Sequence, residues 1–324
     1  MPTSSSPSLL HAHDHGGEGQ PLVLLHGAGR SLADWDAVAP LLVPHHRVLA
    51  VDLPGHGRSP DAGELGVSPW SFTTAADAVR RTVAAYGLLG ALPVGHSLGG
   101  MIALHLAVPG ATGGPVGGSA PGAAPGSAPG SAPGSAPGAV NLDGFWWSRH
   151  ARYPGLDPAA VSAGLERIGG LVRSAAGQIA PAGYVEQQVA YAGTFGIPSD
   201  RAETTVRASV RALPDGGFQT LPLRETALET FDALDTLDLF ALARGVPCPV
   251  LCVRGRRPQP PTPGMEWFEE LTASHTKGLD GDLAALAEER THPTRVEDID
   301  ATHAMLLEEP EAVAALLLAF TGSL

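Results

Sequence analysis

Short apolar runs alternate with amphipathic segments through the first third of the chain. The clearest runs lie at 22–25 and 48–51, and the second leads into a turn rich in glycine and proline at 52–57. The segments that follow them, at about 35–42 and 72–86, repeat apolar side chains at helical intervals. Strands that alternate with helices in this way are typical of a mostly parallel sheet covered by helices.

The strand pattern is replaced by a helical one from about 146 to 244. Asp157 is a suitable N-cap, and Pro158 suits the first position of the helix that it would open. Apolar residues at 206, 210 and 213 predict another helix. We therefore expect a helical cap inserted into the α/β core.

The strand pattern returns at 249–253 and at 295–299. A helix opened by Pro310 then closes the chain, with apolar side chains repeated along one face. The two halves of the core thus flank the cap in the sequence, which predicts a single α/β core with an insertion.

A low-complexity insert separates the first part of the core from the rest. Residues 119–138 repeat a four-residue unit of serine or alanine, alanine, proline and glycine. No side chain in the unit is large enough to offset the cost of ordering it, so we expect a flexible surface loop. The predicted organisation is an α/β-hydrolase-like core of residues 1–112, 139–146 and 245–324, an insert at 113–138 and a helical cap at 147–244.

Length and charge narrow the possible partners. A chain of 324 residues with 44% hydrophobic content is long enough for one large core with an inserted subdomain. Its formal net charge of −13, without a cluster of Lys or Arg, argues against nucleic acid and against an anionic membrane. We expect a small-molecule substrate, and the oligomeric state is not indicated by the sequence.

Two features favour a cytoplasmic location. No apolar run reaches the roughly 18 residues of a spanning helix, and the first residues lack a basic segment followed by an apolar one. Cys248 and Cys252 lie four residues apart in a predicted strand, which would separate their Cα atoms by about 13 Å. Since a disulfide tolerates about 7 Å, we predict two free thiols, as expected in a reducing compartment.

The chemistry centres on Ser97, in the pentapeptide 95–99 that reads GHSLG. The motif G-x-S-x-G holds a serine in a strained turn between a strand and a helix. Here an apolar run at 91–94 precedes it, and a helical segment begins directly after it. We interpret Ser97 as a nucleophile at the carboxyl end of a strand; the alternative is a glycine-rich turn with a helix-capping serine.

A second glycine-rich turn, at 26–29, follows the strand that ends at Leu25. Acyl transfer needs two N–H donors aimed at the developing oxyanion. We assign these donors to the amides of Ala28 and Leu98. We expect His26 to hold the loop rather than to transfer protons.

A serine nucleophile requires a general base, usually histidine. His303 follows the last predicted strand and precedes the closing helix, so its loop would lie at the same sheet edge as Ser97. The alternating histidines at 11, 13 and 15 could suggest a metal site, but near a chain end we expect them to face solvent. We predict neither a metal nor a cofactor.

Four segments together resemble the α/β-hydrolase fold superfamily: HGAGRSLADW, VDLPGHGRS, GHSLGG and THAMLLEEPEAVA. The resemblance implies a mostly parallel sheet of eight strands flanked by helices, a helical cap, and catalytic residues in the chain order serine, acid, histidine. By that match Ser97 is the nucleophile and His303 the base. Relatives with an aspartate nucleophile are disfavoured, because that position is serine here.

The acid departs from the pattern of most of the superfamily. An aspartate would be expected three residues after Gly255, where Pro258 stands. A known variant has the acid after the preceding strand, and Asp143 ends such a strand. We assign Asp143 as the acid, although it could also be a simple turn residue. The alternatives are Asp300, Glu266 or no acid.

Two other features leave a choice open. Pro93 lies in the predicted central strand, where either a bulge or a missing ladder bond must accommodate it. Trp146 and Trp147 follow Asp143 closely, and either line an apolar acyl pocket or pack between cap and sheet.

The sequence therefore predicts a cofactor-independent serine hydrolase that cleaves an ester, thioester or related acyl bond. Alternatives on the same fold are a C–C bond hydrolase, a lactonase or a cofactor-free haloperoxidase. A non-catalytic binding protein is the alternative from another class, because no acid follows Gly255.

Overall fold

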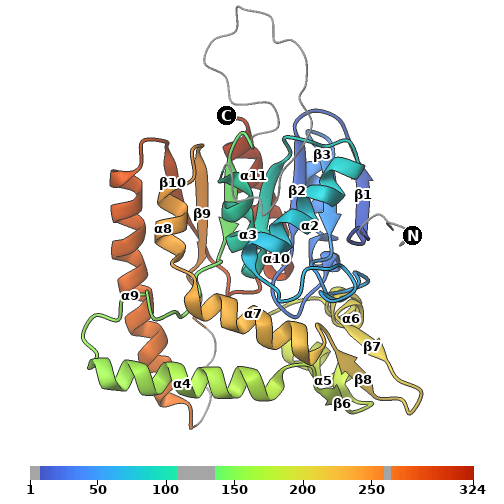
Figure 1. The fold of residues 1–324 in the computed structure, drawn as a ribbon, viewed down its shortest axis with the longest axis vertical. Helices are drawn as coiled ribbons and strands as arrows, with labels where there is room; N and C mark the ends of the chain where they lie inside the picture. The colour runs from blue at the N-terminus through green and yellow to red at the C-terminus, as the bar shows by residue number, and fades with distance from the viewer. Residues whose placement is uncertain (1–7, 109–135, 259–263) are drawn as a thin grey trace, which may run out of the picture.

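The computed structural model describes residues 8–108, 136–258 and 264–324. Their central feature is a seven-stranded sheet in the order β1-β3-β2-β4-β5-β9-β10 (Figure 1). β1 is antiparallel to β3, and every other pair of neighbours is parallel. The strands are β1 (Ala12–Gly16), β2 (Pro21–Leu25), β3 (Arg47–Val51), β4 (Leu92–His96), β5 (Ala139–Leu142), β9 (Val250–Gly255) and β10 (Thr294–Ile299).

The predicted α/β class is confirmed, whereas the strand number differs. The sheet holds seven strands within the described ranges, not the eight that the resemblance implied. An eighth strand would have to pair with an edge strand, β1 or β10. Both are largely polar and only partly buried, so they offer little apolar surface for a further strand to cover.

Helices cover both faces of the sheet (Figure 1). Apolar side chains of β2 alternate between the faces, with Leu22 and Leu24 in one core cluster and Val23 and Leu25 in the other. Burial on both faces explains the uninterrupted apolar run of this strand. The first face is covered by η1 (Leu32–Trp35), α1 (Ala39–Leu42), α10 (Met305–Glu308) and α11 (Pro310–Thr321), and the second by α2 (Phe72–Ala85), α3 (Leu98–Ala107), α8 (Leu239–Arg244) and α9 (Glu266–Glu289).

Pro93 lies in a regular part of β4 and loses a ladder bond. It pairs in register with Val23 of β2, and no bulge interrupts that pairing. The amide of Ser97 donates to the Leu142 carbonyl of β5 at 2.8 Å, and strand amides point alternately to the two sides. The Pro93 nitrogen therefore faces β5, one residue before the recorded β4–β5 register begins at Val94. The missing donor thus lies just outside the paired part of the β4–β5 ladder.

The segment between β5 and β9 contains the helices α4 (Pro158–Ala175), α5 (Tyr184–Gly193), α6 (Ser199–Ala208) and α7 (Arg224–Thr236). It also contains a small antiparallel sheet in the order β6-β8-β7, which the expectation of an all-helical cap missed. The strands of this sheet are β6 (Ile179–Ala180), β7 (Val210–Ala212) and β8 (Phe218–Thr220).

The helix predicted through 206–213 is wrong beyond its first turn. α6 ends at Ala208, and Val210 begins β7. Asp215 and Gly216 form a tight hairpin turn, closed by a hydrogen bond from the Leu213 amide to the Gly217 carbonyl at 2.8 Å. An Asp-Gly pair between two short strands is a strong hairpin signal, and it overrides the helical spacing of the valines.

The two cysteines are free and buried, as predicted. Burial raises the pKa of the Cys248 thiol to about 11 and that of Cys252 to about 12. Within the described ranges, no helix is both long enough and apolar enough to cross a bilayer. Residues 109–135, which include most of the predicted insert, lie outside the described residues.

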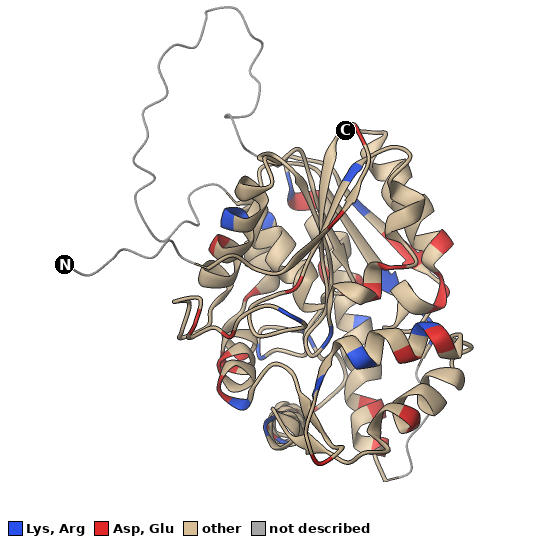
Figure 2. Ribbon diagram, turned by 90° about the vertical axis from the view of Figure 1, so that its right-hand side faces the viewer, with Lys and Arg blue, Asp and Glu red and all other residues tan. Residues whose placement is uncertain are grey.

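Acidic and basic residues are interspersed over the ribbon (Figure 2). Several of the arginines form ion pairs with nearby carboxylates, for example Arg244 with Glu289 at 2.6 Å and Arg173 with Asp232 at 2.6 Å. Exposed pairs of this kind contribute little to stability, but they neutralise the arginines locally.

Candidate active site

Ser97 lies between the last residue of β4 and the first residue of α3. Its backbone has φ 53° and ψ −120°, a conformation that non-glycine residues rarely adopt. β4 and α3 approach each other closely here, which explains the glycine at position 95: a Cβ on Gly95 would lie 1.9 Å from the Gly99 carbonyl oxygen. The serine is thus held in a strained strand-to-helix turn at the carboxyl end of the central strand.

The turn at 26–29 lies directly against this serine. A Cβ built on Gly27 would lie 3.2 Å from the Ser97 Cβ and 3.6 Å from its Oγ. The Gly99 amide donates to the His26 carbonyl at 3.1 Å, which ties the turn to α3. Leu98 is the first residue of α3, so its amide has no carbonyl partner within the helix. Leu98 thus directly follows Ser97, and Ala28, the other predicted oxyanion donor, directly follows the Gly27 that lies against the serine.

His26 holds this turn, as predicted. Its Nδ1 donates to the Gly27 carbonyl at 2.8 Å, and its Nε2 accepts from the Leu53 amide at 3.0 Å. The ring is fully buried, and burial, together with the neighbouring His56, lowers its pKa to about 3. His26 is therefore neutral at pH 7, and both ring nitrogens serve the backbone.

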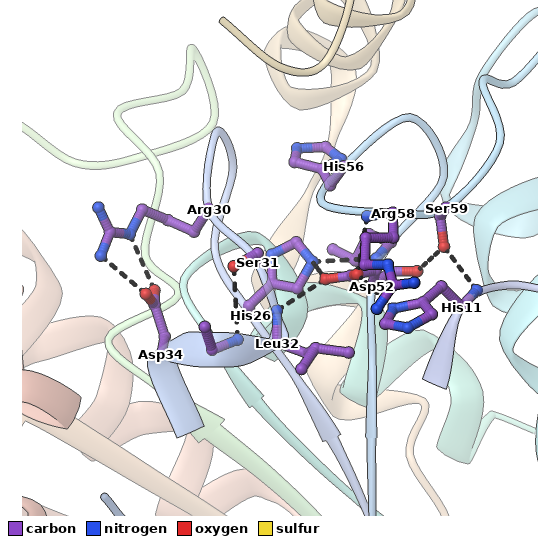
Figure 3. A network of polar contacts seen from close by, with 12 residues as sticks. His11, His26, Arg30, Ser31, Leu32, Asp34, Asp52, His56, Arg58 and Ser59 are labelled. Atoms are coloured by element: carbon purple, nitrogen blue, oxygen red, sulfur yellow. Dashed lines mark hydrogen bonds and ion pairs between the residues drawn. The ribbon is translucent and has the colours of Figure 1, made fainter. Parts of the chain in front are cut away.

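A buried carboxylate supports the same region (Figure 3). Asp52, only 1% exposed, follows β3 and accepts from the amides of Leu32 at 2.7 Å and Arg58 at 2.9 Å. His11 Nδ1 donates to it at 2.8 Å. Because the Leu32 amide opens η1, just after the turn at 26–29, Asp52 joins that turn to two other loops. The sequence reasoning missed this role, although Asp52 stands in the VDLPGHGRS segment.

His303 and Asp143 meet across the sheet edge. His303 Nδ1 donates to Asp143 Oδ2 at 2.7 Å, although the two residues lie 160 positions apart in the sequence. Asp143 directly follows β5 and has a φ of 51°, and its Oδ1 accepts from the Gly255 amide at 3.2 Å. Burial alone would raise the pKa of Asp143, but the hydrogen bond and charge of His303, with the Gly255 amide, lower it below its usual value. The carboxylate is therefore ionised at neutral pH, and it fixes the ring of His303.

The loop that carries His303 is held by a buried glutamate. Glu308 accepts from the Thr302 amide at 3.0 Å and from Arg257 at 3.1 Å. Arg257 stands close in sequence to the position where the resemblance led us to expect an acid. Near that position this chain therefore has an arginine that anchors the loop of His303, and it is Asp143 that orients the His303 ring.

The other two carboxylates weighed as the acid have different partners. The Asp300 side chain is 90% exposed and pairs with Arg257 at 3.3 Å. Glu266 opens α9 and accepts from the Gly264 amide at 3.1 Å. Of the three candidates, Asp143 is the one that the structure joins to His303.

His96 is a site residue that the sequence reasoning missed. Its Nε2 lies 2.7 Å from the backbone oxygen of His303, and the two rings are 4.7 Å apart. Burial, followed by the nearby His303, lowers the pKa of His96 to about 4, so the ring is neutral at pH 7. Its place as the second residue of the GHSLG pentapeptide was the available signal.

Trp146 and Trp147 line a cavity of about 720 Å³ beside the cap. Their rings lie 5.4 Å apart, and Trp146 stacks on Phe231 of α7 at 6.1 Å. In addition, Trp146 packs against the core cluster that contains Leu98. Both tryptophans therefore line the cavity, and Trp146 also packs against the core; a role in binding an acyl group stays a prediction.

One sheet edge thus carries the half-buried Ser97, the His303–Asp143 pair and the segments of the two predicted oxyanion donors. These groups follow β2, β4, β5 and β10, whose carboxyl ends all lie at that edge. In the part of the chain that the structure describes, no three His, Cys, Asp or Glu side chains are grouped to hold a metal ion.

Comparisons with known proteins bear on the fold and the family. A family model for the alpha/beta hydrolase fold matches residues 20–108, which include the turn at 26–29 and Ser97. The 2-succinyl-6-hydroxy-2,4-cyclohexadiene-1-carboxylate synthase of Escherichia coli O9:H4 (strain HS) is 39% identical over 107 residues, 32% of this chain and 40% of that protein. The match thus spans less than half the length of this curated relative.

Solved structures resemble the chain over almost its whole length. An E-2-(acetamidomethylene)succinate hydrolase has a TM-score of 0.65 at 20% identity, covering 97% of this chain and 95% of that one. The enol-lactonase from Burkholderia xenovorans LB400 has a TM-score of 0.55 at 19% identity, covering 97% and 96%. Likeness at these identities concerns the fold. Together with the sheet order and the family-model match over residues 20–108, it shows that the chain has an α/β-hydrolase fold.

Proposed function

We propose that the protein is a cofactor-independent serine hydrolase, which cleaves an ester, thioester or related acyl bond of a small molecule. The observation that carries the proposal is the 2.7 Å hydrogen bond from His303 to Asp143 at the sheet edge that holds Ser97 in its strained turn. A histidine fixed by a carboxylate, at the same sheet edge as a serine in a strand-to-helix turn, supports nucleophilic catalysis by that serine.

In the proposed mechanism, Ser97 Oγ attacks the acyl carbonyl carbon while His303 accepts the hydroxyl proton at Nε2. Nε2 is the nitrogen left for this step, because Nδ1 donates to Asp143. The amides of Ala28 and Leu98 stabilise the oxyanion of the tetrahedral intermediate. His303 then gives the proton to the leaving alcohol or thiol, and an acyl-enzyme remains on Ser97.

Deacylation reverses the roles with water. His303 takes a proton from the water that attacks the acyl carbon, and returns it to Ser97 Oγ as the acid leaves. Asp143 stays ionised throughout and stabilises the imidazolium that forms in both steps. We place this chemistry in a reducing, cytoplasmic compartment, in keeping with the two free thiols.

Two measurements test the proposal. A fluorophosphonate should label the wild-type protein at Ser97, and Ser97→Ala should remove the label. Turnover of p-nitrophenyl acetate should fall by roughly three to six orders of magnitude in Ser97→Ala, with the melting temperature retained. Ester turnover near the wild-type rate in Ser97→Ala would exclude the mechanism.

A second candidate is a reaction other than hydrolysis on the same residues. It is favoured by the 39% identity to a protein named as a synthase over part of its length. Substrate panels discriminate the two candidates. A protein that is labelled by fluorophosphonate but turns over no ester, thioester or lactone would favour the second, whereas an unlabelled protein would favour a non-catalytic binding role.

A further inference from the structure

Among the described residues, one apolar helix face in the cap borders a cavity. Val161, Leu165 and Ile168 repeat at helical spacing along α4, as expected of a face turned toward a core. Only Ile168 is fully buried, and the other two remain partly exposed. All three line the cavity of about 720 Å³, so this face meets an empty space instead of a packed core.

Another part of the cavity lining is aromatic. Trp146, Trp147 and Phe231 form it, and Trp147 also contacts Phe268 with a ring separation of 5.4 Å. Rings held in fixed positions by one another offer flat apolar faces, against which a ligand ring can stack. The volume lies within the range of roughly 300–1,000 Å³ that is typical of small-molecule sites.

Ser97, Asp143 and His303 do not line this cavity, but its aromatic wall belongs to the segment that directly follows the proposed acid. Gly144 lies against the serine, because a Cβ built on it would be 2.5 Å from the Ser97 carbonyl oxygen. Trp146 is two residues further on, so its Cα is within about 7 Å of that of Gly144. Trp146 and Phe231 also pack against the core cluster that contains Leu98.

The charges that line the cavity are balanced. Arg149 and Arg173 are matched in number by Glu166 and Asp235. Arg173 is already engaged by Asp232 at 2.6 Å and lies 3.7 Å from Asp235. A charged ligand would therefore find no net complementary charge, whereas an uncharged apolar group would lose water against the apolar parts of the lining.

We propose that the cavity between α4 and the Trp146–Trp147 wall binds a bulky, uncharged hydrocarbon group of the substrate, with an aromatic ring system preferred. This inference rests on the proposed hydrolase function and names the class of substrate that the site takes. The group is delivered either as the acyl part or as the alcohol part of the substrate, and the experiment distinguishes the two.

Gly169 offers a direct way to fill the cavity. It lies on α4 at the cavity wall, and a Cβ built on it would meet no heavy atom within 4 Å. A leucine there would occupy cavity space without displacing the chain. Replacing a glycine inside a helix also favours the helix, so a loss of activity in Gly169→Leu would not reflect unfolding.

The experiment compares kcat/KM in wild type, Gly169→Leu and the matched control Gly281→Leu. Gly281 lies on α9, outside the cavity, and likewise has open space around its Cβ. The acyl arm uses the p-nitrophenyl esters of 2-naphthoate and acetate, and the alcohol arm uses 2-naphthyl acetate and p-nitrophenyl acetate. In one of the two arms, Gly169→Leu should lower the ratio of bulky to small substrate by roughly tenfold or more, while Gly281→Leu leaves it unchanged.

An unchanged ratio in both arms, or an equal fall in the control, would overturn the proposal. A separate measurement keeps it testable if no ester is turned over. Calorimetric titration of Ser97→Ala with 2-naphthyl acetate should give binding that Gly169→Leu in the same background weakens. Binding without turnover by the wild-type protein would contradict the proposed hydrolase and support the cavity assignment. Turnover of acetate esters without cavity-dependent selectivity would support the hydrolase and contradict the cavity assignment.

Discussion

The imidazole of His96 supports the backbone of His303. Since a carbonyl oxygen can only accept, His96 Nε2 carries the proton and donates to it at 2.7 Å. His96, which directly precedes the proposed nucleophile Ser97, thus fixes the position of the loop that carries the proposed base His303. The lowered pKa of His96, to about 4, also keeps a second positive charge away from His303 during catalysis.

His96→Phe keeps the ring but removes this hydrogen bond and leaves the His303 carbonyl unpaired. We expect kcat to fall by about tenfold, the effect of one neutral hydrogen bond at its upper range, with KM almost unchanged. Steady-state kinetics with a p-nitrophenyl ester checks this. His105→Phe, a half-buried histidine later on α3, is the control, and equal kinetics in the two variants would contradict a positioning role for His96.

Asp143→Asn should lower kcat by about four orders of magnitude, because an amide cannot hold the required tautomer of His303 or stabilise its cation. Asp300→Asn changes a carboxylate that is exposed and faces Arg257, so its kcat should stay within about twofold of wild type. Both variants are compared in the same ester assay. A larger loss in Asp300→Asn than in Asp143→Asn would reverse the assignment of the acid.

Asp52→Asn should destabilise the fold as well as the turn at 26–29. Oδ2 of Asp52 accepts two hydrogen bonds, from Arg58 and His11, and an asparagine would leave one of its two terminal atoms without acceptor capacity. We expect the free energy of unfolding to fall by about 1–3 kcal/mol in urea titrations. Asp14→Asn, which removes an exposed ion pair with Arg47, should cost less than about 1 kcal/mol. Equal losses would show that the buried network has no special role.

As the pH is lowered, the free energy of unfolding should begin to fall at pH values well above those at which carboxylates titrate. Burial lowers the pKa of His26 to about 3, and that of His56 and His96 to about 4. The unfolded chain, with histidine pKa values near 6.5, therefore binds more protons than the folded one below that pH. Stability is full above about pH 6.5 and falls as the pH decreases toward 4. Urea unfolding at pH 7.5, 6 and 5 measures this, and a constant or rising free energy of unfolding would contradict it.

Local signals made much of the site predictable. The pentapeptide around Ser97, the turn before Ala28 and the loop of His303 each combine short-range chemistry with a place at the end of a strand. Because the carboxyl ends of parallel strands lie at one edge of the sheet, the sequence alone predicts that these segments lie close together. Asp143 instead required the resemblance, because a known variant of the family has its acid after the strand that precedes the usual one.

Features that depend on packing between distant segments were not visible. The bond from His96 to the backbone of His303 joins residues that no pattern connects. The long helix α9 was not predicted, because Gly278 and Gly281 interrupt its apolar spacing, although four of its leucines are buried against the core. The segment of β7 was predicted as helix, because Val206, Val210 and Leu213 share a helical interval.

The short link from Asp143 to Trp146 ties the proposed acid to the first ring of the cavity wall. Any backbone shift that reshapes this wall for another ligand also displaces the carboxylate that orients His303. The cavity-lining residues of α4 begin at Pro158, fifteen positions after Asp143 in the sequence. Changes of substrate preference are therefore easier to evolve or engineer through α4 than through the tryptophans, whose replacement alters rate and preference together.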